Sequence, residues 1–163
     1  MYLLDANVLI RADADFYPLE RIPQFWEWLI EMGNSDQVKL PLEIYQEIAA
    51  GAGTLAEWIT NKDTKAALLL RETTDPARIQ YVLDTGYQAQ DKRFNDGELQ
   101  KIGKDAFLVA YALAEDGRVV VTREVSGPAK RLGNRKLPDV CNDCNVQWTN
   151  DYEMYRLLDF NLR

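Results

Sequence analysis

Short apolar runs alternate with helical hydrophobic patterns along most of the chain. Runs of β-forming residues predict buried strands at residues 2–4, 37–40, 119–121 and 145–148. Apolar positions spaced three or four residues apart predict helices with one buried face. These helical patterns cover residues 22–32, the segment after Pro41, and residues 55–60, 75–86, 105–114 and 151–158.

The segments between these patterns are polar or rich in turn-forming residues. Residues 13–18 and the basic stretch 126–138 are predicted to be loops, whereas residues 65–72 fit either a helix or a strand. Strands that alternate with helices predict a central, mostly parallel sheet covered by helices on both faces. We therefore expect an α/β fold, with one domain over residues 1–163.

Composition narrows the class of protein. The chain has 163 residues, of which 47% are hydrophobic and 28% charged, as is typical of soluble globular domains. It holds no uncharged apolar segment of about 18 residues and no cleavable signal pattern. Two cysteines, Cys141 and Cys144, are too few for a disulfide framework. These features predict a cytoplasmic protein with no membrane partner.

The chain contains no histidine, so catalytic and metal sites that require histidine are excluded. Catalysis by Ser-His-Asp or Cys-His groups and metal sites with histidine ligands are excluded. Cys141 and Cys144 have the spacing of a zinc knuckle or a redox pair. No further Cys or His completes such a metal site, so a structural role is favoured. Carboxylates remain as the groups able to carry catalysis.

Charge is distributed unevenly. The net charge of −7 argues against broad adhesion to nucleic acid, which depends on clustered Lys and Arg. Residues 117–138, however, carry six basic side chains and only one acid, Glu124. This stretch fits a docking surface for a phosphate-bearing partner, and it fits equally well a solvated loop whose charges favour solubility.

Asp5 ends the first predicted strand and is the first candidate functional residue. Ligands of open α/β sheets bind outside the carboxyl ends of the strands, so a carboxylate there is a candidate active-site group. Asp5 also suits a helix cap. Similar positions recur at Glu47 on the helix after the second strand, Asp105 at a helix start, and Glu124 after a third strand. A single capping aspartate does not explain this recurrence.

A parallel sheet gathers such strand ends along one edge, so the four acids are expected to converge. Converging carboxylates repel one another unless a cation neutralises them. Mg²⁺ or Mn²⁺ is the natural partner, because both ions prefer oxygen ligands and share substrate phosphates. A bound ion of this kind can activate water toward a phosphodiester. Metal-dependent phosphodiester hydrolysis therefore fits these residues best.

Four ordered motifs together resemble those of the PIN-domain family. They are residues 3–10 around Asp5, Glu47-Ile48 with Gly51 following, residues 104–112 around Asp105, and residues 119–124 ending at Glu124. The chain also resembles a longer PIN branch that carries Pro23-Gln24-Phe25-Trp26 and Leu137-Pro138-Asp139-Val140-Cys141. The resemblance implies a PIN-like three-layer α/β/α sandwich and a Mg²⁺- or Mn²⁺-dependent ribonuclease, commonly the toxin of a toxin–antitoxin pair.

The resemblance also assigns roles by position. It makes Asp5, Glu47, Asp105 and Glu124 the catalytic acids, with direct metal ligation expected of Asp5, Asp105 and Glu124. Hydrogen-bonding support and substrate contacts are expected from Asn7, Thr122, Arg123 and Lys104. Three positions depart from the family pattern: Ala6 replaces a hydroxyl residue, Lys104 replaces a small residue, and Glu124 replaces the more usual Asp.

Other interpretations remain open. Glu43, one turn before Glu47, is a rival acid that also suits the positive end of its helix. A PIN-like module that binds RNA or protein without cleaving it is favoured if Lys104 pairs with Asp105. A haloacid-dehalogenase-type phosphatase shares the strand ending in aspartate, but Asn7 stands where its second acid is expected. The expected partners are an RNA substrate, an antitoxin protein and a second copy of the chain.

Overall fold

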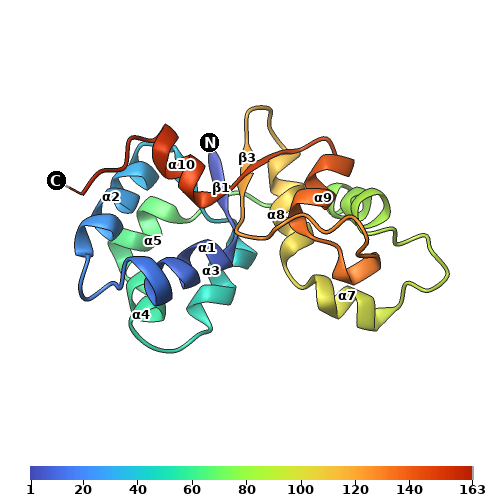
Figure 1. Ribbon diagram of the computed structural model, residues 1–163, viewed down its shortest axis with the longest axis horizontal. Coiled ribbons are helices and arrows are strands. Elements are labelled where there is room, and N and C mark those ends of the chain that lie inside the picture. The colour runs from blue at the N-terminus through green and yellow to red at the C-terminus, as the bar shows by residue number, and fades with distance from the viewer. Residues whose placement is uncertain (163) are drawn as a thin grey trace.

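Four short strands form one central sheet in the computed structural model, which describes residues 1–162 (Figure 1). The strands are β1 (Tyr2–Leu4), β2 (Val38–Lys39), β3 (Val119–Val121) and β4 (Gln147–Thr149). Their order is β2-β1-β3-β4, and every neighbouring pair is parallel. The predicted parallel sheet and all four predicted strand positions are therefore confirmed.

Helices cover both faces of the sheet, as in a three-layer α/β/α sandwich. In Figure 1, α2, α4 and α5 lie on one side of β1 and β3, and α7, α8 and α9 lie on the other. The helical elements in order are α1 (Ala6–Arg11), η1 (Ala12–Phe16), α2 (Pro23–Asn34), α3 (Leu42–Ala49), α4 (Thr54–Thr60), α5 (Lys62–Leu68), α6 (Pro76–Tyr81), η2 (Val82–Gly86), α7 (Asp96–Ile102), α8 (Asp105–Ala112), η3 (Leu132–Asn134), α9 (Leu137–Asp143) and α10 (Asp151–Leu157).

The two central strands bury side chains on both faces. Leu3, Leu4, Val120 and Val121 are all fully buried, as expected for strands covered by helices on both sides. Helix α8 packs against both strands, and its buried run of apolar residues forms part of the same core. The first residue of α8 is therefore held close to the carboxyl ends of β1 and β3.

Two predicted loops differ from the structure, and one ambiguous segment is resolved by it. Residues 13–18 were expected to be a loop, but η1 is a π-helical turn in which the Tyr17 amide donates to the Ala12 carbonyl. The expected loop at residues 126–138 contains the 3₁₀ turn η3, and α9 begins at its end. The ambiguous segment 65–72 combines both predictions, since α5 ends at Leu68 and Leu69 forms a parallel bridge with Leu40.

The two cysteines lie on the buried side of α9 and at its end. Cys141 and Cys144 are both free thiols and are almost completely buried. Burial raises the pKa of both, that of Cys144 to about 11. Within residues 1–162, no helix has both the length and the apolar character needed to cross a bilayer.

Candidate active site

The carboxyl ends of β1 and β3 place Asp5 beside Thr122. Leu4 pairs with Val121 in the parallel register, so the residues after both strands leave the sheet at the same edge. Asp5 Oδ2 accepts a hydrogen bond from the Thr122 hydroxyl at 2.9 Å, and Asp5 Oδ1 accepts one from the Asn7 backbone amide at 3.5 Å. The second contact caps α1, so the capping role of Asp5 is confirmed. The first joins Asp5 to the neighbouring strand.

The surroundings of Asp5 disfavour its ionised form. Its exposed fraction is only 3%, and burial raises its pKa from 3.8 to about 6. The hydrogen bonds from Thr122 and Asn7 stabilise the carboxylate and so lower the pKa, whereas the charges of Glu124 and Glu47 raise it. The ionised form of Asp5 would therefore be stabilised by a positive charge bound nearby.

Asp105 is the first residue of α8 and lies in the same environment. Burial raises its pKa well above 3.8, and the charges of Asp5, Glu124 and Glu47 raise it further. The positive charge of Lys136 acts in the opposite direction. Because electrostatic interactions weaken with distance, these mutual effects place the four predicted acids in one neighbourhood.

The two candidate acids of α3 have different surroundings. Glu47 is exposed, and its charge acts on both Asp5 and Asp105. Glu43 lies near Tyr111, whose hydroxyl donates to the Glu72 carbonyl at 3.2 Å. Burial and the charge of Glu43 raise the pKa of Tyr111 to about 12. The structure therefore places Glu47 with the aspartates and gives Glu43 a different neighbour.

Glu124 already has partners for both of its carboxylate oxygens. Its Oε1 accepts a hydrogen bond from Lys136 Nζ at 3.0 Å, and its Oε2 accepts one from the Leu137 backbone amide at 2.7 Å. The second contact is made at the first residue of α9, so Glu124 satisfies a free amide there. These contacts could not be predicted from the sequence, because they depend on where α9 begins.

Metal ligation stays a prediction. Within residues 1–162, no group of three or more acids or cysteines is arranged closely enough to hold an ion. The donor chemistry nevertheless fits Mg²⁺ or Mn²⁺, since Asp5 and Asp105 supply carboxylate oxygens whose charges oppose each other. Glu124 would complete the set, but in this structure Lys136 and the Leu137 amide donate to its two oxygens. These three residues are the ones that would hold the ion.

The side chains of Lys104 and Arg123 contact groups other than the four acids. Asn7 has an exposed side chain. Lys104 Nζ lies 5.5 Å from the centre of the Phe107 ring, and no ion pair joins it to Asp105 in the described part of the chain. Arg123 lies 3.4 Å from Asp151 and over the rings of Phe16 and Tyr152. Substrate contacts by these residues stay predictions.

Replacing Thr122 tests how Asp5 is positioned. Thr122→Val removes the hydroxyl that donates to Asp5 and accepts from the Glu124 amide. Because the site is buried, we expect the free energy of unfolding to fall by about 1–2 kcal/mol. We also expect RNA cleavage to slow, with Thr122→Ser restoring both properties. Urea denaturation and cleavage rates measure this, and a Val variant that matches the native chain contradicts the positioning role.

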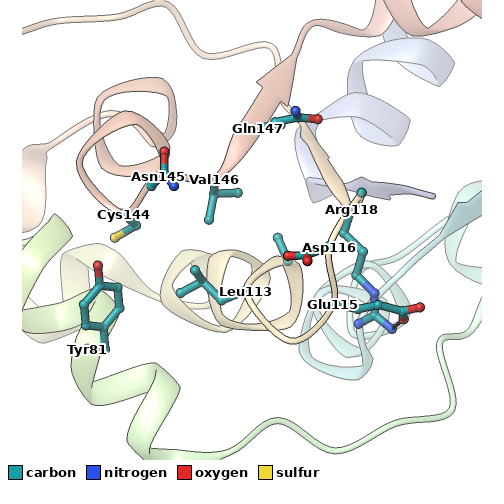
Figure 2. Close-up of a pocket in the computed structure, with 11 residues that line it drawn as sticks. Tyr81, Leu113, Glu115, Asp116, Arg118, Cys144, Asn145, Val146 and Gln147 are labelled. Carbon is teal, nitrogen blue, oxygen red and sulfur yellow. Dashed lines mark hydrogen bonds and ion pairs between the residues drawn. The ribbon is translucent and has the colours of Figure 1, made fainter.

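A separate pocket of about 560 Å³ opens near the amino ends of β3 and β4 (Figure 2). Arg118, just before β3, forms ion pairs with Glu72 and Glu115 at 2.7 Å each. This pocket lies at the edge of the sheet opposite Asp5, and the charge of its arginine is already compensated. It therefore does not overlap with the acids of the candidate site.

Comparison with known proteins identifies a family but assigns no activity. No curated protein matches the chain. A family model described as "Domain of unknown function (DUF4411)" matches residues 2–162, which include every element described above. The chain therefore belongs to the DUF4411 family.

Proposed function

We propose that this protein is a metal-dependent endoribonuclease that hydrolyses RNA phosphodiesters at the acids around Asp5. The observation that carries the proposal is the position of Asp5 and Asp105 near the carboxyl ends of β1 and β3, where desolvation and neighbouring carboxylates raise the pKa of both. Structural carboxylates are usually neutralised by Lys or Arg, whereas these two are crowded by further acids. Perturbed acids of this kind are typical of functional sites.

A divalent cation resolves the electrostatic conflict. Bound Mg²⁺ or Mn²⁺ would supply an activated water and neutralise charge that develops on the phosphodiester. Asp5, Asp105 and Glu124 would hold the ion. Glu47, which is exposed beside them, would accept a proton from the attacking water. Thr122 and the Asn7 amide fix the Asp5 carboxylate in place. The motif resemblance to PIN domains supports the same assignment.

The test is metal-dependent cleavage of a panel of single-stranded RNAs. The native chain is titrated with Mg²⁺ and Mn²⁺ and compared with Asp5→Asn, with Asp63→Asn as the matched control. Asp63 is exposed on α5 and is not among the charged groups that shift the pKa of Asp5 or Asp105. We expect metal-dependent cleavage by the native chain and the control, and its loss in Asp5→Asn. Cleavage that persists in Asp5→Asn contradicts the proposal.

One observation favours a second candidate, an RNA-binding module that does not cleave. Glu124 is engaged by both Lys136 and the Leu137 amide, so one predicted metal ligand is occupied by protein groups. Metal-independent RNA binding without cleavage supports this alternative. Hydrolysis of small phosphomonoesters alone would instead favour a phosphatase.

The wider biological role rests on the resemblance alone. A toxin of a toxin–antitoxin pair, an antitoxin partner and a homodimer are all compatible with the proposed nuclease. Each stays a prediction.

A further inference from the structure

A pocket of about 330 Å³ lies directly beside Asp105 and Glu124. Besides these two acids, its lining consists of basic and small polar groups, namely Lys101, Lys130, Gly133, Asn134, Arg135 and Lys136. Four of its lining residues are therefore cationic. The pocket therefore combines two acids with four cations, in a chain whose net charge is −7. We call the part of the lining formed by Lys101, Lys130, Arg135 and Lys136 the basic wall.

The basic wall is assembled from two segments that are distant in sequence. The turn η3 packs closely against α7. The Gly133 amide donates to Glu98 Oε2 at 2.9 Å, and Lys101 Nζ donates to Glu98 Oε1 at 2.7 Å. Glu98 thus holds Lys101 and the η3 turn at fixed positions relative to each other. An added Cβ at Gly133 would overlap the Glu98 carbonyl, which shows how closely the two segments approach.

The cations of the wall differ in how far they are already compensated. Arg135 is paired with Asp143 at 2.5 Å, and Lys136 is paired with Glu124. Lys130 is exposed and forms no ion pair within residues 1–162, and the Lys101 side chain remains 49% exposed in its pair with Glu98. Lys101 and Lys130 are therefore the cations best able to receive an anionic ligand.

We propose that this pocket binds a phosphate group of the RNA strand, next to the phosphodiester held at the acids. The inference rests on the proposed function and extends it to a second contact on the same strand. Lys101 and Lys130 supply the charge, and the Asn134 side chain supplies a neutral hydrogen-bonding group. A phosphate suits this wall because four cationic side chains and Asn134 line the same pocket.

The position of the pocket explains how an acidic protein holds a polyanion. The cations of the basic wall attract the phosphate and so offset the repulsion between the RNA strand and the carboxylates of Asp105 and Glu124. Contacts with phosphates position a strand without reading its sequence. The pocket therefore sets the direction of the strand across the acids and leaves the choice of base to other groups.

The test measures RNA binding without cleavage. Fluorescence anisotropy follows a labelled single-stranded RNA in EDTA, for the native chain, for Lys101→Ala/Lys130→Ala, and for the control Lys62→Ala/Lys92→Ala. Both double variants remove the same charge, and Lys62 and Lys92 are exposed residues outside the pocket. We expect the pocket variant to bind at least about 10-fold more weakly and with a shallower salt dependence. The control should change much less.

The outcomes test phosphate binding in the pocket independently of nuclease activity. Equal losses in the two double variants overturn the pocket, because they reflect only overall charge. Native-like binding by the pocket variant overturns it as well, as does equal binding of polyglutamate to the native chain. If RNA binding depends on Lys101 and Lys130 but no metal supports cleavage, the pocket stands and the nuclease proposal fails. Circular dichroism verifies that both variants fold.

Discussion

Asp105→Asn is expected to slow RNA cleavage by several orders of magnitude and at the same time to stabilise the folded chain. Asp105 is partly buried near three other acids, and its pKa is raised by desolvation and by their charges. The amide keeps the shape of the side chain but carries no charge, so the repulsion disappears. Loss of a metal ligand removes charge stabilisation of several kcal/mol, which corresponds to a rate decrease on the order of 10³-fold.

Two measurements on the same preparation separate these effects. Cleavage rates at saturating Mn²⁺ report the catalytic loss, and urea denaturation at pH 8 without metal reports stability. Asp63→Asn, an exposed substitution of the same kind, should change neither quantity. If Asp105→Asn both retains activity and loses stability, Asp105 is a structural residue and its assignment to the site is wrong.

The pH dependence of stability provides the second large effect. Asp5 has a pKa of about 6 in the folded chain and 3.8 as its ordinary value. The folded chain therefore binds this proton more tightly than the unfolded chain. The stabilisation is complete below about pH 4 and is lost as the pH rises from about 4 to 6. A shift of this size corresponds to a contribution on the order of 3 kcal/mol.

The comparison that isolates Asp5 is native chain against Asp5→Asn. The variant should be as stable as the native chain near pH 4 and more stable above pH 6, where the native carboxylate must ionise. The Asn side chain fits the site, because it can accept from the Asn7 amide and donate to Thr122 Oγ1. A stability difference that does not vary between pH 4 and pH 8 contradicts the raised pKa.

Added metal should reverse this pH trend. An ion binds the ionised carboxylates, so Mn²⁺ should raise the melting temperature of the native chain at pH 8. At pH 4.5, where Asp5 is protonated, the rise should be much smaller. In Asp5→Asn it should be small at both pH values. A uniform rise in all these samples would indicate nonspecific binding of metal.

The sheet and most helices could be predicted because local patterns and tertiary structure agree. Val119, Val120 and Val121 form a short apolar run, and only a buried central strand suits it. The helix beginning at Asp105 has an equally clear apolar pattern. In these elements, burial and local propensity favour the same conformation, so a single sequence was sufficient.

Two helices near the site were missed for different reasons. Helix α7 is short and polar and buries only Ile102, so it has almost no apolar periodicity. Helix α9 begins with Leu137-Pro138, a favourable helix start, but it directly follows the basic stretch that suggested a loop. The position of both helices depends on contacts with η3 and Glu124 that sequence periodicity cannot show.

The proximity of the four acids could be predicted from the sequence, whereas their contacts could not. The proximity of Asp5 and Glu124 follows from the parallel pairing of β1 and β3, whereas Asp105 begins α8, which packs against both strands. The pairing of Glu124 with Lys136 and the Leu137 amide depends on where α9 begins. The position of Lys101 beside the site could not be predicted either, because it depends on the packing of α7 against η3.

The buried thiols described on α9 have a practical consequence. Cys141 and Cys144 are shielded from solvent, and their raised pKa values keep them protonated at neutral pH. Maleimide dyes, which react with exposed thiolates, should leave both untouched. A single cysteine introduced at an exposed position such as Lys92 would therefore accept one fluorophore. Energy transfer to a dye on an oligonucleotide could then follow docking in real time with the native cysteines in place.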